Sequence, residues 1–409
     1  MDKRFFPLFF TVFLDLLGLG IVIPIFAQLF LAQNGLLPVS YPLWVRTLLY
    51  GIFISSYPFA QFFGAPVLGA LSDTYGRKKL LLLSLAGTVI GYILIGIAVT
   101  MQTLLLAYIG RLLDGFTGGN ISLVMSSMAD LSDKSNKAKN FGLIGMAFGL
   151  GFIMGPYVGG RLADPSVVRW FTFATPFWFT AFLCMINIIL VIWSFQETLG
   201  ARVSQQLPQR VFHSSIIFSS ILHLKKAYAL AELRNMFLVV FLFTFGFTFF
   251  TQFFQVFLIQ RFSFDQTHIG ELYAYMGVWI VLAQGGVMRI TAKLWKPQQI
   301  LVVAPLVLSF VLPVLLWPHV PYYLWLILPF VSLSHGLTHP NAVALVSNLA
   351  SKDKQGEILG INQSIVSAAQ AVPPLIAGVA VSININLPIL FAGLSTLVGW
   401  IIFLLFVRV

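Results

Sequence analysis

Long apolar stretches recur along almost the whole chain and are separated by short polar connections. A helix needs about 20 apolar residues to cross a hydrocarbon layer about 30 Å thick, because each residue adds about 1.5 Å. Twelve stretches reach this length, and we predict that each forms one membrane-spanning helix. In the first half of the chain they run from Phe5 to Leu31, Trp44 to Leu71, Leu80 to Val99, Leu104 to Met128, Ala138 to Leu162 and Phe171 to Phe195. In the second half they run from Asn235 to Gln260, Ile269 to Ile290, Ile300 to Trp317, Tyr322 to Asn348, Glu357 to Ile383 and Leu387 to Val407.

One long polar connection, Gln196 to Arg234, divides the predicted spans into six and six. Its position near the midpoint of the chain indicates a duplicated architecture. We therefore predict an all-α membrane protein with an N-terminal six-helix bundle over residues 1–196, a cytoplasmic linker over 197–234 and a C-terminal six-helix bundle over 235–409. Residues 211–224 of the linker alternate apolar and small polar positions, which predicts either an interfacial helix or an ordered loop on the membrane surface.

The composition agrees with a lipid environment, since 58% of the residues are hydrophobic and only 9% are charged, against about 25% charged in soluble domains. The net charge of +11 reflects topology, because the bases lie between the spans and all twelve lysines fall on the side of the N-terminus. This bias predicts a multi-pass protein of the cytoplasmic (inner or plasma) membrane with both termini in the cytoplasm. It argues against a nucleic-acid partner. A single cysteine, Cys184, excludes a disulfide framework and a thiolate metal site.

The connection after the second span carries a dense polar signature, G-A-L-S-D-T-Y-G-R-K-K, from Gly69 to Lys79. Gly69 would let helices approach closely, and Gly76 permits the positive φ of a tight turn. Asp73 could accept hydrogen bonds from exposed amides or lie at a helix N-terminus, while Arg77 and the two lysines hold the turn at the cytoplasmic surface. The alternative is a simple hairpin that only obeys the charge rule for topology.

Asp15, Arg111 and Asp114 lie inside predicted spans, where a charge is costly unless it is paired or faces water. Arg111 and Asp114 are three residues apart on the fourth span, so they share one helical face. They form either a buried ion pair that only aligns helices or a site that handles protons or substrate. Asp15 stands alone among apolar residues of the first span and could take up and release a proton. Arg111 is its candidate partner, and a static Asp15–Arg111 bridge is the alternative to proton coupling.

The fifth span carries glycines at four-residue spacing, Gly151, Gly155 and Gly159, with Pro156 among them. Such spacing makes a flat strip for close helix packing, and proline removes a backbone donor and bends the helix. We interpret the strip as a hinge or a seal.

Amide side chains within the spans either bridge helices or line a cavity for substrate. The residues that we predict to line the cavity are Gln28, Gln61, Asn120, Gln252, Gln255, Gln284, Asn341 and Asn362. His335 and His339 lie four residues apart on one helix face. Because no third Cys, Asp or Glu accompanies them, they are a weak metal signal, and helix packing is the favoured interpretation. We predict no metal, no cofactor and no catalytic residue.

These motifs together resemble the major facilitator superfamily. The signature from Gly69 to Lys79 is similar to the cytoplasmic signature between its second and third helices. Arg111 to Gly115 resembles the fourth-helix signature of proton-coupled members, and Gly151 to Gly160 resembles the fifth-helix signature of its drug/proton antiporters. Similarity to the tetracycline/proton antiporter branch extends through most of the chain. Further residues that support it are Asp130, Asp133, Pro340, Gln355 to Ser364, Pro373 and Pro374.

Two departures from that branch limit what the resemblance implies. The carboxylates that tetracycline exporters carry in their third and ninth helices have no counterpart between Leu80 and Val99 or between Ile300 and Trp317. The second-half turn from Gly286 to Lys296 keeps the bases and lacks the aspartate. We therefore expect a substrate other than tetracycline and two halves that are not mechanically equivalent.

The resemblance implies a secondary transporter in which two six-helix bundles, folded as in major facilitators, alternate about a central site. It implies a proton-coupled antiporter that exports a drug-like or amphipathic small molecule, acts as a monomer and uses Asp15, Arg111 and Asp114 for proton coupling. The residues implied in conformational gating are Gly69, Asp73, Gly76, Arg77, Gly151, Gly155, Pro156 and Gly159.

Alternative functions stay open at this point. One is a dedicated exporter or importer of one metabolite, such as a siderophore or organic solute, and another is a transporter-like membrane sensor. The sequence contains no phosphate-binding G-x-x-x-x-G-K-[ST] loop and neither the H-E-x-x-H nor the G-x-S-x-G motif of hydrolytic enzymes, so we predict that the protein is not an enzyme.

Overall fold

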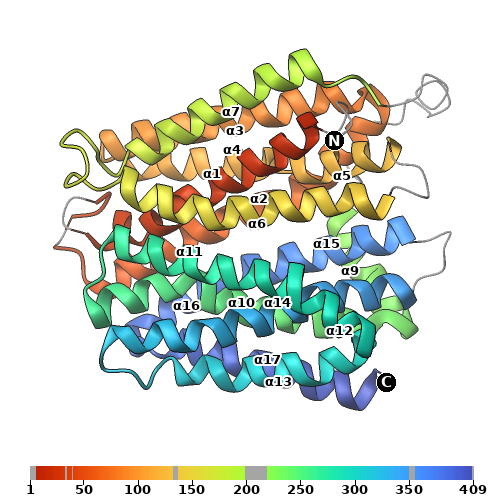
Figure 1. Cartoon of the computed structure of the whole chain (residues 1–409). Helices are drawn as coiled ribbons and strands as arrows, with labels where there is room; N and C mark the ends of the chain where they lie inside the picture. Colours follow the sequence, from red (N-terminus) through yellow and green to blue (C-terminus); the bar gives the residue numbers. More distant parts are fainter. Residues whose placement is uncertain are drawn as a thin grey trace. The chain divides into compact units, whose positions relative to one another are not determined.

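The computed structural model describes residues 6–32, 35–38, 40–131, 137–198, 219–349 and 355–407. Over these residues the protein is helical and contains no strand (Figure 1). The helices of the first half are α1 (Phe6–Leu31), α2 (Leu43–Tyr75), α3 (Arg77–Thr100), α4 (Leu104–Thr117), α5 (Asn120–Asp130), α6 (Lys137–Leu162) and α7 (Thr175–Ser194). Those that follow are α9 (Ser219–Ala229), α10 (Ala231–Phe262), α11 (Gln266–Leu282), η1 (Ala283–Val287), α12 (Met288–Leu294), α13 (Pro297–Val314), η2 (Pro321–Tyr323), α14 (Leu324–Leu349), α15 (Gln355–Ala371), α16 (Pro373–Ile383) and α17 (Leu387–Phe406).

All twelve predicted spans are helical, which confirms the predicted fold class. Nine spans are single helices, and three are interrupted. The fourth breaks at Gly118 and Gly119 between α4 and α5, the eighth contains the π-helical turn η1, and the eleventh breaks before Pro373. Within the described part of the chain, seven helical segments are long and apolar enough to cross a membrane, and one of them, Gly360–Ile383, includes the break between α15 and α16.

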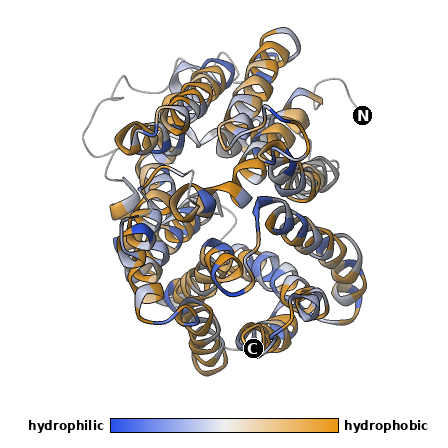
Figure 2. Cartoon of the chain, turned by 90° about the vertical axis from the view of Figure 1, so that its left-hand side faces the viewer, coloured by the Kyte–Doolittle hydropathy of each residue, from blue (hydrophilic) through white to orange (hydrophobic). Residues whose placement is uncertain are grey.

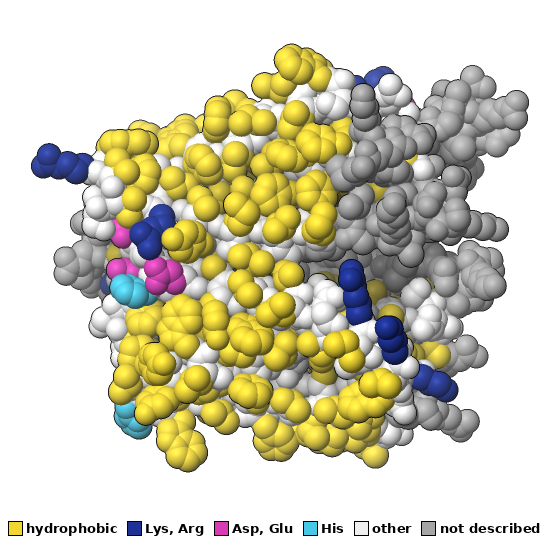
Figure 3. Space-filling view, viewed as in Figure 1, with side chains coloured by type: hydrophobic (Ala, Val, Ile, Leu, Met, Phe, Trp, Pro, Cys, Tyr) yellow, Lys and Arg dark blue, Asp and Glu magenta, His cyan; other side chains and the backbone are white. Residues whose placement is uncertain are grey.

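The surface is as apolar as a lipid environment requires. Figure 2, coloured by hydropathy, shows that hydrophobic residues prevail along the helices. On the face shown in Figure 3, hydrophobic side chains cover most of the described surface, and the visible Lys and Arg side chains lie toward its two ends. Many large apolar side chains lie on the surface. Among them, Leu105 is 71% exposed, Trp193 is 83% exposed and Leu405 is 70% exposed. Apolar surface of this extent is rare on soluble proteins and is what lipid tails cover.

Contacts between residues group the chain into two units. Unit 1 consists of Met1–Val39, Phe59–Ser219 and Gln266–Ala274. In it, α1 packs against α6 and α7, and α3 packs against α4 and α7. Leu8, Leu81 and their neighbours form a buried apolar cluster among these helices. This packing positions the ionisable residues of α1 and α4.

Unit 2 consists of Ser40–Pro58, Ser220–Asp265 and Tyr275–Val409. Helix α10 packs against α14, α15, α16 and α17, and α13 packs against α14 and α17. Their apolar cluster includes Phe237 and Phe403. Helix α9, at the end of the linker, contributes Ala227 to this cluster, and its His223 Nδ1 lies 3.1 Å from the Ser364 hydroxyl of α15. The stretch predicted as an interfacial helix or an ordered loop is therefore helical from Ser219, and residues 211–218 lie outside the described part.

Two helices run from one unit into the other. The first part of α2 belongs to unit 2, where the Thr47 hydroxyl donates a hydrogen bond of 2.9 Å to the Gly378 carbonyl. The Tyr50 hydroxyl donates one of 2.6 Å to the Gln252 carbonyl. The first part of α11 belongs in turn to unit 1. The units defined by contacts therefore differ from the predicted domains at these two helix ends.

Candidate functional site

Helix α4 holds a buried ion pair in unit 1. Arg111 Nη1 lies 3.4 Å from Asp114 Oδ2, and the two side chains are 7% and 3% exposed. The i, i+3 spacing brings the two groups together on one helical face. The guanidinium also lies over the Phe26 ring of α1, 4.6 Å from its centroid, at a distance typical of cation–π attraction. Arg111 therefore links α4 to α1.

Asp15 lies on α1 and is 7% exposed. Neither of its carboxyl oxygens has a hydrogen-bond partner among the described residues. It is close enough to Asp114 for the two carboxyl groups to interact electrostatically. The static Asp15–Arg111 bridge, which the sequence left open as the alternative to proton coupling, is not formed among the described residues, where Arg111 pairs with Asp114. A carboxylate without a donor is unfavourable in a low-dielectric interior, whereas a protonated carboxyl group is tolerated there.

Two further buried polar residues of unit 1 were not singled out in the sequence. Asn187 of α7 accepts a hydrogen bond of 3.0 Å from the Thr11 hydroxyl of α1, and its side-chain nitrogen has no partner in the described residues. The buried Thr88 hydroxyl of α3 lies beside the Asp114 carboxyl group. Asn187 is a lone amide in an apolar stretch, and this signal could have identified it.

The turn between α2 and α3 has the predicted conformation. Gly76 has a φ of 103°, which confirms the positive φ expected of it. Arg77 Nη1 lies 2.6 Å from Asp73 Oδ1 and also donates to the Ser72 hydroxyl. Asp73 therefore pairs with Arg77. At Gly69, an added Cβ atom would meet no atom within 4 Å, so the close approach expected there is not made in this conformation.

Glu197 occupies the helix N-terminus that the sequence suggested for Asp73. Its carboxylate accepts hydrogen bonds from the backbone amides of Arg77, at 2.9 Å, and Lys78, at 3.1 Å. These two amides begin α3 and have no partner within the helix. A negative charge at this end also interacts favourably with the helix dipole. Glu197 thus connects the end of the sixth span to the signature turn.

The glycine strip of α6 faces α1. A Cβ atom at Gly151 would lie 2.7 Å from Leu16 Cβ, and one at Gly155 would lie 2.6 Å from Gly20 Cα. At Gly159 it would collide with the Ile21 carbonyl group. The strip therefore allows α6 and α1 to pack with their backbones in close contact, as a seal requires.

The end of α6 also contacts the start of α11 within unit 1. The Thr267 hydroxyl donates a hydrogen bond of 2.8 Å to Asp164 Oδ2, and Gln266 Nε2 donates one of 3.3 Å to the Ala163 carbonyl. Arg161 Nη2 lies 3.2 Å from Glu271 Oε1. An added Cβ atom at Gly270 would collide with the Pro156 carbonyl. We call these contacts the α6–α11 junction.

Asp164 lies in the connection after α6, outside the membrane-spanning segments. Burial raises the pKa of its carboxyl group, but hydrogen bonds from Ser166 and Thr267 and the charge of Arg161 outweigh it and hold the pKa below its usual value. Since the lowered pKa means that the junction favours the charged carboxylate, Asp164 contributes to it above the usual pKa of about 3.9 and loses this contribution as the pH falls.

The predicted cavity amides of unit 1 behave differently from one another. Gln61 of α2 donates a hydrogen bond of 2.8 Å to the Gly118 carbonyl, at the break between α4 and α5, so it bridges helices. Gln28 is buried. The side chain of Asn120 lies outside the described part of the structure.

The predicted cavity amides of unit 2 include two that are buried and have an unsatisfied side-chain oxygen. Gln255 Oε1 and Asn362 Oδ1 have no hydrogen-bond partner among the described residues. Asn341 donates to the Leu337 carbonyl of its own helix at 2.7 Å. Gln252 is partly buried, and Gln284 is exposed on the π-helical turn η1.

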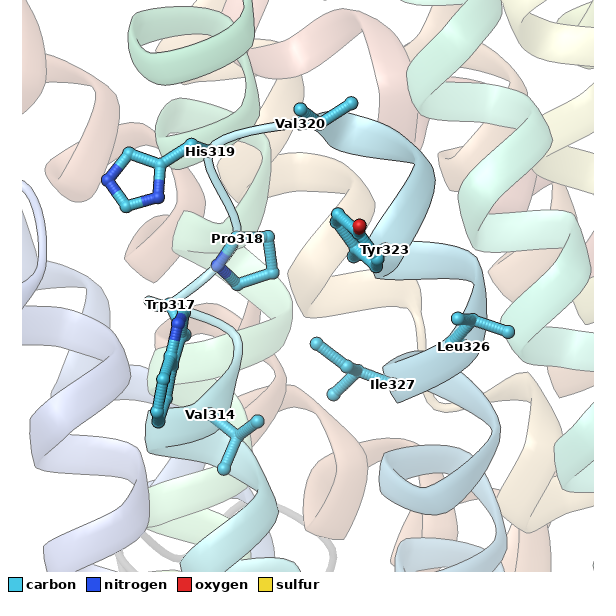
Figure 4. Close-up of a pocket in the computed structure, with 8 residues that line it drawn as sticks. All are labelled: Val314, Trp317, Pro318, His319, Val320, Tyr323, Leu326 and Ile327. Carbon is cyan, nitrogen blue, oxygen red and sulfur yellow. The ribbon is translucent and has the colours of Figure 1, made fainter.

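A pocket of about 450 Å³ lies at the hairpin between α13 and α14 (Figure 4). Trp317, Pro318, Tyr323 and Ile327 are among its lining residues, and none of the lining residues is an acid, Lys or Arg. Aromatic residues of this kind are enriched at membrane interfaces. The pocket therefore has the character of an interfacial aromatic site and lacks the ionisable groups that α1 and α4 carry.

The apolar helices, with ionisable side chains buried among them, have the architecture of a membrane transport protein. The sequence model of the Major Facilitator Superfamily matches residues 8–372, and the chain belongs to this superfamily.

Its relatives include proteins named for resistance to drugs. The chain is 28% identical over 410 residues to tetracycline resistance protein class H of Pasteurella multocida, which covers 98% of this chain and 94% of the relative. It is 24% identical over 401 residues to multidrug resistance protein 2 of Bacillus subtilis (strain 168), covering 97% and 93%. It is 28% identical over 406 residues to major facilitator superfamily domain-containing protein 10 of Bos taurus, covering 91% and 86%. The predicted resemblance to tetracycline resistance proteins is confirmed.

Solved structures show the same fold. The human organic anion transporter MFSD10 (TETRAN) superposes with a TM-score of 0.73 at 22% identity, covering 98% of each chain. A D-xylose–proton symporter superposes with a TM-score of 0.74 at 13% identity, covering 96% of this chain and 97% of the other.

Proposed function

We propose that this transporter is a proton-coupled antiporter that exports an amphipathic small molecule from the cytoplasm. The observation that carries the proposal is the state of Asp15, a carboxyl group buried in α1 without a hydrogen-bond donor among the described residues and close to the Arg111–Asp114 pair. Similarity to tetracycline and multidrug resistance proteins supports the direction of transport.

In this proposal Asp15 exchanges a proton during the cycle. The charged form of Asp15 needs a cation, and Arg111, which pairs with the neighbouring Asp114, is the candidate. Because Arg111 already pairs with Asp114, ionisation of Asp15 would place two carboxylates beside one guanidinium, which favours a single shared proton between them. A change of partner by Arg111 would then couple proton release to a change of conformation.

The test is proton flux in proteoliposomes that contain the purified protein and a pH-sensitive dye. The panel of compounds comprises lipophilic cations, tetracyclines, siderophores and amino acids. We expect at least one compound to evoke proton movement, and Asp15→Asn to abolish it while leaving expression and folding intact. Asp265→Asn is the matched control, because it makes the same chemical change at an exposed acid in the connection between α10 and α11. Equal coupled flux in Asp15→Asn and the parent protein would overturn the proposed role.

The second candidate function is a dedicated carrier of one organic solute. The absence of acids from the third and ninth spans favours it, because the chain lacks carboxylates that tetracycline exporters carry there. The fold shared with a structure named as an organic anion transporter agrees with it. Transport of a single compound, with no response to the other members of the panel, would favour this candidate.

A further inference from the structure

The second half of the chain has an unusual inventory of ionisable groups. No Asp or Glu occurs between Glu271 and Asp353 or after Glu357. Helix α10 has Glu232 and Arg234 near its start and Arg261 near its end. Its sequence between Arg234 and Arg261 contains no acid, Lys, Arg or His. Apart from tyrosine, His335 and His339 are therefore the only ionisable side chains well inside the spans of this half. A charged ligand in contact with these spans would meet imidazole and no carboxylate.

The two histidines form a compact group with an aromatic wall. The His335 ring stacks on Phe247 of α10, with the ring planes 5° apart and the centroids 3.3 Å apart. The His335 and His339 ring centroids lie 6.0 Å apart. Rings at this spacing can both donate to one acceptor group between them, because each N–H···O hydrogen bond spans about 2.7–3.2 Å. Phe250 continues the wall, 5.7 Å from Phe247.

The side chain of His339 is exposed. Its helix, α14, packs through Gly336 against Ala283 of η1. The elements packed against α14 include α10, α13, α15, η1 and η2, and α11 contacts it through Tyr275. Over the described side chains, α13, α15, η1 and η2 have no acid, Lys or Arg, α10 has them only near its ends, and α11 has His268 and Glu271 near its start.

We infer that His335 and His339, with Phe247, form a binding site for a planar aromatic anion that binds together with a proton. This inference rests on the proposed transport function and names its substrate class. A protonated imidazole carries a positive charge. An anion supplies the opposite charge, so anion and proton stabilise one another and bind cooperatively. The ring of the ligand packs on the apolar wall of α10, while its anionic group accepts hydrogen bonds from the imidazoles.

The test uses two probes with the same ring and opposite charge. They are naphthalene-2-sulfonate, which is anionic at every pH used, and (naphthalen-2-ylmethyl)trimethylammonium. Binding to the purified full-length protein in detergent is measured by equilibrium dialysis at about pH 8 and about pH 6, the range in which histidine titrates. We expect the sulfonate to bind more tightly than the ammonium probe and to bind about tenfold more tightly at the lower pH.

Variants separate charge from packing. We expect His339→Gln to weaken sulfonate binding about tenfold and to remove its pH dependence, because glutamine donates a hydrogen bond but carries no charge. His335→Phe retains an aromatic ring beside Phe247 and should also weaken binding. His268→Gln, at an exposed histidine near the start of α11, is the matched control and should leave binding unchanged.

The outcomes distinguish this inference from the proposed function. Preference for the ammonium probe, or full sulfonate binding with unchanged pH dependence in His339→Gln, would overturn the anion site. Either result would leave proton coupling at Asp15 intact, because that is measured by proton flux. Loss of anion binding in His339→Gln with normal thermal stability would support the site whether or not Asp15→Asn affects flux.

Discussion

At the scale of single residues, position in the membrane determines what each charge can do. Arg111 is satisfied from two sides, by Asp114 of its own helix and by the Phe26 ring of α1. Asp15 has no such satisfaction among the described residues. Glu197 lies at the exposed end of the sixth span and stabilises a helix terminus. The carboxyl group of Asp15 is thus buried without a hydrogen-bond partner among the described residues, whereas the carboxyl group of Glu197 caps a helix.

A prediction at this scale concerns Glu197. Glu197→Ala removes the acceptor of two amides at the start of α3, so we expect it to lower the stability of the purified protein by about 1 kcal/mol, as loss of a helix cap does. Glu197→Gln keeps one acceptor oxygen and should have a smaller effect. Thermal unfolding in detergent measures both. Equal melting temperatures for Glu197→Ala and the parent protein would show that these hydrogen bonds contribute nothing to stability.

Sequence reasoning identified the charged residues of the spans but not all of their partners. Arg111 and Asp114 were paired correctly by their spacing, because helical geometry alone brings residues three apart together. The partner assigned to Asp15 was not found, because contacts between different helices depend on packing that no local spacing reveals. Glu197 was missed for the same reason: it meets Arg77 across 120 residues of sequence.

At the scale of helices, α6 and α1 show how small residues determine helix packing. The strip of Gly151, Gly155 and Gly159 was recognisable from its spacing, and its partner helix was not. In the structure, the backbones of α6 and α1 meet at this strip. Span positions were likewise predicted from apolar length, whereas the π-helical turn η1 depends on how the eighth span packs.

A prediction at the scale of helices compares Gly155 and Gly69, because the sequence predicts close helix packing at both. Gly155→Ala places a methyl group 2.6 Å from Gly20 Cα, so α6 must move away from α1, and we expect a loss of about 1–3 kcal/mol in stability. Gly69→Ala is the control, since its methyl group meets no atom within 4 Å and alanine favours the helix. Thermal unfolding of both variants checks this. A larger loss for Gly69→Ala than for Gly155→Ala would contradict the packing described here.

At the scale of the whole molecule, the start of α11 belongs to unit 1 and its remainder to unit 2. The first part of α2 belongs in the same way to unit 2. Alternating access requires contacts that form in one state and break in another. The polar contacts of the α6–α11 junction are single hydrogen bonds and one partly exposed ion pair, which contribute little individually. It has the weak, polar character that a reversible contact needs.

We therefore expect a covalent bond across the junction to stop transport. Asp164→Cys and Thr267→Cys replace side chains whose oxygens lie 2.8 Å apart, and oxidation should join them by a disulfide. The native Cys184 is buried and should not interfere. Substrate flux in proteoliposomes should fall to background on oxidation and return on reduction, whereas each single-cysteine variant should keep its flux under both conditions. Undiminished flux in the oxidised double variant would show that the junction stays closed throughout the cycle.

The π-helical turn η1 also changes how the eighth span must be read. A π-helical turn accommodates one more residue than an α-helical turn, and one residue corresponds to a rotation of about 100° around the helix axis. The helical wheel of α11 therefore does not continue into α12, and the bases Arg289 and Lys293 project in a direction that the phase of α11 does not give. In the first half, α2 runs without such an interruption to Tyr75. The two related turns thus differ not only in their residues but also in angular phase, and aligning the two halves residue by residue would superpose faces that point in different directions.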